Sequence, residues 1–397
     1  YPTAPDDCNV AVVRTIEKMG ETNLIIPGYS SHDIGSLACQ LSVANGARFI
    51  EKHIKLGSVE WVHFDGVALD AKNVIVVTPQ PTVTINESSG YEVVKINKED
   101  NFGQAARKFL SANNNYIVLV DESFVNNFSR LVQLKSNITA DQKTVVFVLT
   151  NTTPTKFKLE ATHTIENLAL ANVVGMIPGK SLSNEYVIFS GHYDHLGING
   201  ARAINGDSIY NGANDDAAGT TAMIMLSKYF KKLNNNERTL IFVAFTAEEV
   251  GGFGAQYFSK QFDPLTVKAM FNLEMIGTES KWGKNSAYIT GYEKTNMGDI
   301  LQKNLEGSAF KFYPDPYTDQ NLFYRSDNAT LARLGVPAHT ISTSKMDSEP
   351  NYHKPSDEFQ TLDMDNMNEI IKAIALSSRT IVSGKDTPTR VDTKQLK

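Results

Sequence analysis

The pattern of hydrophobic and polar residues is most regular from residue 169 to the C-terminus, where short apolar runs alternate with longer amphipathic segments. Continuous apolar runs bounded by polar turns indicate strands buried on both faces, and apolar residues that recur every three to four positions indicate helices. The predicted strands are 186–190, 238–246, 269–276 and 337–343, and the predicted helices are 216–233 and 364–381. This alternation favours an α/β fold in which helices cover both faces of a central sheet.

The preceding part of the chain shows two other patterns. Residues 1–70 read as helix, strand, helix and strand, at 6–19, 24–26, 34–45 and 48–53, which is the rhythm of an α/β unit. Residues 71–168 contain short β-type runs at 74–78, 116–120 and 144–149, and one helix at 102–111. We therefore predict three parts: an N-terminal α/β segment (1–70), a small β-rich accessory region (71–168) and a C-terminal domain (169–397).

Composition and charge argue against several kinds of partner and protein class. The 397 residues include 38 Lys and Arg against 44 Asp and Glu, a net charge of −6 that argues against a nucleic-acid or anionic-membrane partner. No apolar run is long enough to span a bilayer. Two cysteines, Cys8 and Cys39, cannot form a disulfide framework. The first residues lack a basic and an apolar segment, so we expect no signal peptide, or one already removed.

The candidate chemistry lies in five segments rich in His, Asp and Glu. Three of them follow predicted strands, and two precede predicted helices or lie in loops. In an open α/β sheet, segments that follow parallel strands meet at one edge, so these five can converge although they are distant in sequence. The segments are SGHYDHLG (190–197), NGANDD (211–216), TAEE (246–249), NLEM (272–275) and NYHKPSDE (351–358).

These residue types suit zinc, because the set offers histidines and carboxylates without cysteine. One carboxylate could bridge two ions, an arrangement suited to hydrolysis of an acyl or phosphoryl bond. In the pair Glu248-Glu249, one carboxylate could bind metal and the other could accept a proton from water. Taken singly, His192 could be a packed histidine and Asp215-Asp216 a helix cap, but five such segments in order argue against that interpretation.

These five segments, as HYDHLG, NGANDDAAG, TAEEVGGFGA, NLEMIG and YHKPSDEF, resemble the ordered motifs of the di-zinc aminopeptidase family. That family also includes glutamate carboxypeptidase and glutaminyl cyclase, and the resemblance covers residues 169–385. It implies a three-layer αβα sandwich with a central mixed sheet, of the phosphorylase/hydrolase type, and two co-catalytic zinc ions.

The resemblance also implies metal ligands. His192 and Glu274 would bind one zinc ion, Glu249 and His353 would bind the other, and Asp215 would bridge the two. The family usually has Asp where this chain has Glu274. Glutamate is one methylene longer but still offers an oxygen ligand, so this difference bears on the geometry and occupancy of that zinc site.

The resemblance further implies catalytic and substrate-binding residues. Glu248 would be the general base that activates a metal-bridging water and later the proton donor to the leaving amine. Asp194 would orient His192, and Tyr352 would stabilise the oxyanion of the tetrahedral intermediate. Ser326, Asp327 and Asn328 would lie near the substrate, although many relatives have His in place of Asn328, which could equally be a helix cap.

The opening segment resembles a different family. YPTAPDDCNV, PGYSSHDIGS and NGARFIEKHIKLG are similar to the last part of the barrel of sialic acid synthases. By that resemblance His32 and His53 match metal-binding histidines, with Ser31 where the family usually has Asp. A (β/α)8 barrel needs about 200 residues or more, so this segment alone cannot build that active site, and we expect both histidines to be idle or structural.

We therefore expect a zinc-dependent exopeptidase, and specifically an aminopeptidase that acts on peptides with a free N-terminus. One alternative is a glutaminyl cyclase-like transferase, which would use one zinc ion rather than two. A second is a non-catalytic binding relative of the same fold, and a sialic acid synthase activity is disfavoured by the missing barrel. The family resemblance and the scarcity of cysteine suggest a secreted or periplasmic protein, while the side-chain specificity and the oligomeric state stay open.

Overall fold

The computed structural model describes residues 28–31, 49–52, 58–136, 138–139, 142–163, 165 and 169–396. The helices expected at 6–19 and 34–45, the strand expected at 24–26, and His32 and His53 lie outside the described residues. The chain divides into two compact units, one of residues 1–52 with 169–397 and the other of residues 53–168. In the larger unit, β1 (Gly28–Ser31) pairs in parallel with β2 (Phe49–Lys52).

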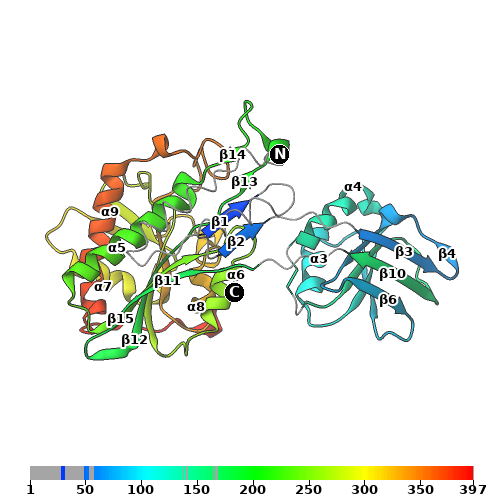
Figure 1. Ribbon diagram of the computed structural model, residues 1–397, viewed down its shortest axis with the longest axis horizontal. Coiled ribbons are helices and arrows are strands. Elements are labelled where there is room, and N and C mark those ends of the chain that lie inside the picture. The colour runs from blue at the N-terminus through cyan, green and yellow to red at the C-terminus, as the bar shows by residue number, and fades with distance from the viewer. Residues whose placement is uncertain are drawn as a thin grey trace. The chain divides into compact units, whose positions relative to one another are not determined.

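A seven-stranded mixed sheet forms the centre of the larger unit (Figure 1). Its four inner strands β15, β12, β16 and β19 run parallel, while β11 pairs antiparallel with β15, and β17 pairs antiparallel with β19. β18 lies parallel to β17 at the far edge. In spatial order the strands are β11 (Val173–Ile177), β15 (Arg238–Phe245), β12 (Leu182–His192), β16 (Val267–Leu273), β19 (Ala338–Ser342), β17 (Ser286–Ile289) and β18 (Lys311–Pro314).

Helices cover both faces of this sheet because the side chains of each strand alternate between them. On β12, Phe189 packs in a core with α5 (Gly219–Leu233), α7 (Met297–Asn304), α9 (Met364–Ser377) and α10 (Arg379–Val382). The neighbouring Ile188 packs in a second core, with α6 (Phe253–Ser259) and α8 (Asn328–Ala332). Figure 1 shows α5, α7 and α9 together on one side of the sheet. The expected three-layer αβα sandwich is confirmed.

Aromatic stacking across the inner strands strengthens the first core. The ring centroid of Phe189 lies 4.8 Å from that of Phe271 on β16 and 5.5 Å from that of Phe242 on β15, and the rings of both pairs are stacked and nearly parallel. Pairs of this kind contribute about 0.5–1.5 kcal/mol beyond the burial of their area. They add side-chain contacts between three strands whose backbone pairing sets their register and whose ends carry candidate ligands.

The smaller unit is β-rich, as expected, and contains two four-stranded sheets. One has the order β4, β3, β10, β6 and the other the order β5, β9, β8, β7. The sheets share one core, and the outer face of the second packs against α3 (Phe102–Ser111) and α4 (Val125–Phe128). The strands are β3 (Ser58–Phe64), β4 (Val67–Ala68), β5 (Val74–Val77), β6 (Thr82–Asn86), β7 (Glu92–Ile96), β8 (Tyr116–Val120), β9 (Val145–Leu149) and β10 (Phe157–His163).

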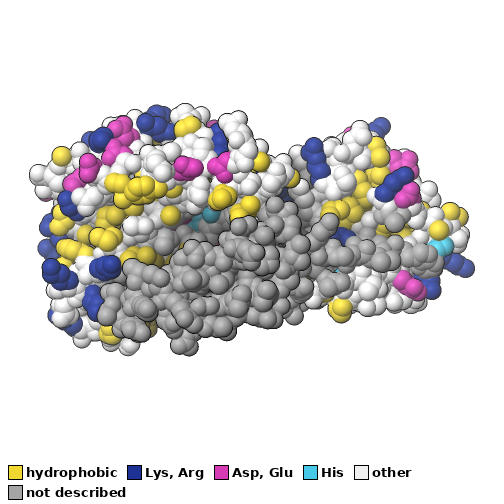
Figure 2. Space-filling model, turned by 45° about the horizontal axis from the view of Figure 1, so that its top comes forward, with side chains coloured by type: hydrophobic (Ala, Val, Ile, Leu, Met, Phe, Trp, Pro, Cys, Tyr) yellow, Lys and Arg dark blue, Asp and Glu magenta, His cyan; other side chains and the backbone are white. Residues whose placement is uncertain are grey.

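The described surface mixes side chains of different kinds. Along the upper edge of Figure 2, Lys and Arg side chains lie among Asp and Glu side chains, with hydrophobic side chains between them. No helix within the described ranges combines the length and the hydrophobicity of a membrane span.

Candidate metal centre

The parallel strands deliver three of the five motifs to one edge of the sheet. β12 ends at His192, and β16 ends at Leu273, directly before Glu274. β15, which pairs in parallel with β12, ends shortly before Glu248 and Glu249. Because parallel strands present their carboxyl ends at the same edge, these side chains are brought together from distant parts of the chain.

Hydrogen bonds of the Asp216 carboxylate connect this edge of the sheet to the loop that carries Asp215. Both residues lie in the turn 213–218 before α5. One oxygen of Asp216 accepts a hydrogen bond from the amide of His192, and the other accepts from the amides of Gly219 and Met275, each at 3.1 Å. A Cβ on Gly219 would collide with the carbonyl oxygen of the residue before Glu274 and with Asp216 itself, so close packing also requires glycine here.

Asp357 supports the same loop from the other side. Its two buried carboxylate oxygens accept hydrogen bonds from the amides of Asn214 (2.8 Å) and Asp215 (3.0 Å). Residues that support metal ligands in this way typically change metal affinity about 10- to 100-fold when mutated. Asp357 thus fixes the backbone from which the Asp215 side chain projects.

We expect Asp357→Ala to weaken metal binding and to destabilise the fold, because it leaves two buried amides without an acceptor. The expected losses are about 10- to 100-fold in zinc affinity and about 1–3 kcal/mol of unfolding free energy per unsatisfied group. Competition titration with a zinc chelator and denaturant unfolding measure the two effects. Asp363→Ala is the matched control, since it removes a carboxylate that caps α9 through the amide of Asn366. Equal zinc affinities of the two variants would contradict this role.

Asp215 lies at the centre of two groups of potential ligands. In the first group, the ligand atoms of His192, Asp215 and Glu274 lie within 4.8 Å of one another. In the second, the same holds for His195, Asp215 and Glu249. The two carboxylate oxygens of Asp215 face different histidines, since Oδ1 is 3.2 Å from Nε2 of His192 and Oδ2 is 3.2 Å from Nε2 of His353. Asp215 therefore has the placement of a bridging carboxylate.

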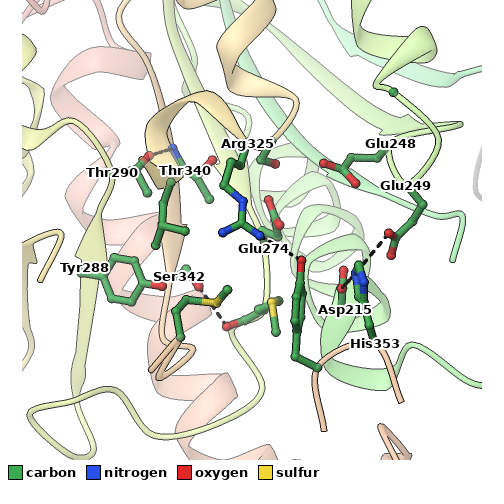
Figure 3. Close-up of a pocket in the computed structure, with 16 residues that line it drawn as sticks. Asp215, Glu248, Glu249, Glu274, Tyr288, Thr290, Arg325, Thr340, Ser342 and His353 are labelled. Atoms are coloured by element: carbon green, nitrogen blue, oxygen red, sulfur yellow. Dashed lines mark hydrogen bonds and ion pairs between the residues drawn. The ribbon is translucent and has the colours of Figure 1, made fainter. Parts of the chain in front are cut away.

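His353 closes the second group. Its Nε2 is 3.1 Å from Oε2 of Glu249, while the other oxygen of Glu249 is 2.6 Å from Nδ1 of His195. Its ring also stacks on that of Tyr352, with centroids 3.9 Å apart. Figure 3 shows Asp215, Glu249 and His353 side by side at one end of a cavity.

Several of these atoms are buried without a hydrogen bond of acceptable geometry. They are Nε2 of His192, both ring nitrogens of His195 and Oε1 of Glu249. Lone pairs that lie close together yet do not point at a donor are costly to bury, unless a cation accepts them. Imidazole nitrogens and carboxylate oxygens without thiolates are a donor set that zinc binds well. The residues present therefore fit zinc.

The pKa shifts within the cluster also indicate a site for cations. Burial and the neighbouring carboxylate of Asp215 outweigh the effect of His192 and raise the pKa of Glu274 to about 7. Burial acts to lower the pKa of His353, but Asp215 and Glu249 raise it to about 9. For Asp215 the close contacts of His192 and His353 overcome burial and hold the pKa below its usual range. Divalent cations at this point would relieve the repulsion among the buried carboxylates.

The adjacent Glu248 and Glu249 differ in environment. Burial, together with the charges of Glu274 and Glu249, raises the pKa of Glu248 well above its usual range. Burial acts on Glu249 as well, but the close contacts of His195 and His353 lower its pKa. Paired carboxylates whose pKa values are pushed apart are suited to different tasks, one to proton transfer and the other to binding a cation.

Asp194 contacts both the histidine and the glutamate pair. Its backbone carbonyl is 3.0 Å from Nδ1 of His192, whereas its carboxylate is 3.8 Å from that atom. The carboxylate accepts hydrogen bonds from the amides of Glu248 (3.1 Å) and Glu249 (3.2 Å). The main chain of Asp194 thus orients the histidine, and its side chain anchors the turn that carries the two glutamates.

The cavity of about 320 Å³ extends from the ligand cluster to a second end between β17 and β19. Figure 3 shows Arg325 between the two ends, above Glu274. Hydroxyl groups at the second end donate their hydrogen bonds into the protein, since Thr340 donates to Asn328, Ser342 to the carbonyl of Met275, and Tyr288 to the carbonyl of Ser344. These hydroxyl hydrogens are therefore already used within the protein, and Leu322 and Met346 add apolar side chains at this end. Its lining is Tyr288, Thr290, Leu322, Thr340, Ser342 and Met346.

Of the three residues expected near the substrate, Ser326 lines this cavity, whereas Asp327 and Asn328 are buried and do not. Asn328 begins α8, and its amide group donates to the carbonyls of Phe323 and Ala338 while its oxygen accepts from Thr340. Those bonds leave the Asn328 side chain no group for a substrate, which argues for a structural role.

The structure adds four residues that the sequence analysis did not propose: His195, Asp216, Asp357 and Arg325. His195 and Asp216 lie inside quoted motifs, so proximity to His192 and Asp215 could have suggested them. Asp357 lies in the same motif as His353, so its position there could also have suggested it. Arg325 directly precedes Ser326, which was expected near the substrate, so the same proximity could have suggested it.

Two protein-family models match the chain. The model described as peptidase family M28 matches residues 172–377, just over half of the chain. The model described as NeuB family matches residues 1–71. The first match confirms the resemblance of the C-terminal motifs to zinc aminopeptidases.

Relatives with assigned names agree with the first match. A probable leucine aminopeptidase of Trichophyton verrucosum is 32% identical over 211 residues, which are 51% of this chain and 54% of that protein. Aminopeptidase YwaD of Bacillus subtilis is 22% identical over 261 residues, 62% of this chain and 53% of that protein. The chain thus spans about half the length of these relatives.

Among solved structures, the zinc aminopeptidase BSAP of Bacillus subtilis is similar with a TM-score of 0.47 and 14% identity, over 84% of this chain and 86% of that one. A glutaminyl cyclase of Porphyromonas gingivalis has a TM-score of 0.43 and 16% identity, over 54% and 79% of the two chains. With a family model that matches more than half of its length, the chain belongs to peptidase family M28.

Proposed function

We propose that this protein is a zinc-dependent aminopeptidase that removes apolar residues from peptides with a free N-terminus. The observation that carries the proposal is the placement of Asp215, whose two oxygens face two ligand groups, with Glu248 next to both. His192 and Glu274 would hold one ion, and Glu249 and His353, with His195 close by, would hold the other. The apolar end of the cavity, lined by Tyr288 and Met346, supports an apolar N-terminal residue.

Bound zinc would supply a Lewis acid that polarises the scissile carbonyl and lowers the pKa of a water molecule. Glu248 takes the proton from the attacking water and returns it to the leaving amine. Burial raises the pKa of Tyr352, so its hydroxyl stays protonated and can donate a hydrogen bond to the carbonyl oxygen as negative charge develops. Asp194 and Asp357 keep the surrounding turns in place through their hydrogen bonds to the backbone.

The direct test is hydrolysis of aminoacyl p-nitroanilides by the purified, zinc-loaded protein. We expect faster turnover for leucine and other apolar residues than for charged ones, and none once the N-terminus is acetylated. Cyclisation of an N-terminal glutamine without hydrolysis would assign the site to the glutaminyl cyclase class instead. A zinc-loaded protein that turns over neither kind of substrate would contradict the proposal.

Removing the metal should make stability fall as pH rises. A group whose pKa is raised by folding stabilises the protein below its unfolded value and loses that contribution above its folded value. For Glu274 the loss runs from 4.5 to about 7, and for His353 it runs from 6.5 to about 9. We therefore expect the Tm of chelator-treated protein to fall between about pH 5 and 9. The gap to zinc-loaded protein should widen over that range in thermal unfolding scans, and a narrowing gap would contradict the assignment.

A further inference from the structure

Arg325 places a cation in a cavity whose other charged side chains are mostly acidic. It lies between Tyr324 and Ser326, just before α8, and its guanidinium projects into the middle of the cavity (Figure 3). Its Nη2 donates a hydrogen bond to the hydroxyl oxygen of Tyr352 at 3.3 Å. Arg325 is otherwise exposed.

Within the part of the chain that the structure describes, Arg325 forms no ion pair with a carboxylate. Among the acidic residues of the cavity, Asp215 and Glu249 pair with histidines instead. A guanidinium presents several donors in a planar fork, and the contact with Tyr352 uses only one of its nitrogens. The remaining donors match a carboxylate, which guanidinium binds in bidentate fashion.

The position of Arg325 relative to Tyr352 decides which part of a substrate it reaches. Under the proposed function, the Tyr352 hydroxyl donates to the oxygen of the scissile carbonyl. That hydroxyl oxygen accepts from Arg325, so its own hydrogen remains available for the substrate. The guanidinium therefore lies beside the position of the scissile carbonyl, and a carboxylate on the residue that follows this carbonyl is within its reach.

We propose that Arg325 binds a carboxylate carried by the residue directly after the scissile bond, so that dipeptides are preferred substrates. The inference rests on the proposed aminopeptidase function and adds a substrate class to it. A dipeptide presents its terminal carboxylate at that position, whereas a longer peptide presents a neutral amide. An acidic side chain on the second residue offers the same chemical group from another atom.

Three substrates with the same apolar N-terminal residue X separate these cases: X-Gly, X-Gly-amide and X-Asp-amide. For the unmodified, zinc-loaded protein we expect kcat/KM for X-Gly to exceed that for X-Gly-amide by about 10- to 100-fold, the usual effect of a hydrogen bond to a charged group. In Arg325→Ala this ratio falls to about one, mainly through KM. Arg325→Lys should retain part of this preference, because lysine keeps the positive charge but lacks the planar set of donors that binds a carboxylate through two hydrogen bonds.

X-Asp-amide identifies the source of the carboxylate. A rate close to that of X-Gly means that side-chain carboxylates are also accepted, and a rate close to that of X-Gly-amide restricts recognition to the C-terminus. Arg333→Ala is the matched control, since Arg333 is an exposed arginine in the same segment that contacts the ring of Tyr324 and does not line the cavity.

Two results would overturn the inference while leaving the proposed function intact. An equal loss for all three substrates in Arg325→Ala would place the guanidinium on the scissile carbonyl, and unchanged rates would show that it does not contact the substrate. If the unmodified protein hydrolyses none of the three, the proposed function fails, and this inference fails with it.

Discussion

Replacing Glu248 by glutamine is expected to reduce kcat by about 10²- to 10⁴-fold, the range for a lost general acid–base group. Glutamine keeps the shape of the side chain but cannot accept a proton from the attacking water. Glu248 is adjacent to the ligand cluster but is absent from both candidate ligand groups. Zinc content and KM should therefore stay close to those of the unmodified protein, and steady-state kinetics with metal analysis by mass spectrometry measures all three.

Glu249→Gln is the informative comparison for this variant. It makes the same replacement, glutamate by glutamine, at the neighbouring position. Glu249, however, lies 2.6 Å from His195 and 3.1 Å from His353 within a candidate ligand group. We expect it to lose zinc as well as activity. If Glu248→Gln kept full turnover with zinc bound, the role assigned to that residue would be wrong.

Replacing Asp215 by alanine is expected to abolish activity and to lower the occupancy of both metal positions together. Asp215 is the one residue that belongs to both candidate ligand groups within the described residues. Each of its oxygens faces a different histidine at 3.2 Å, so neither group stays complete without it. Zinc content per protein after gel filtration, followed by titration with zinc, measures the loss.

The matched variant is Glu274→Ala, which removes a ligand from the first group only. We expect it to retain up to half of the metal content, because His195, Glu249 and His353 are untouched. An Asp215→Ala variant that binds as much zinc as Glu274→Ala would exclude a bridging role. Circular dichroism should show native secondary structure in both variants, which separates metal loss from unfolding.

Much of the fold follows from local sequence pattern. The apolar runs at 238–246 and 337–343 correspond to β15 and β19, and the amphipathic segment at 102–111 is α3. Such strands and helices can be predicted from the sequence because their buried positions are either continuous or periodic. The edge strands β11 and β18 were not predicted: they are short, and their side chains are only partly buried, so pairing with a neighbour rather than local preference defines them.

The site was predictable as a set of residues but not as a geometry. The motifs brought His192, Asp215 and His353 into consideration, since their residue types and order were visible in the chain. Nothing local indicated that His195 lies 2.6 Å from Glu249, because that contact joins the ends of two strands. The hydrogen bonds of Asp216 to the amides of distant motifs are equally long-range, and a helix cap was a reasonable first interpretation.

The order of the ligands along the chain has a consequence for biosynthesis. The metal cluster is assembled from residues between His192 and His353, and its last ligand follows β19, the fourth of the parallel strands to be synthesised. Until that segment leaves the ribosome, Asp215 and Glu249 lack the histidine that contacts both of them. Contacts of such wide sequence separation form late and slowly. A chain of this design is therefore expected to acquire its metal after translation of the whole domain.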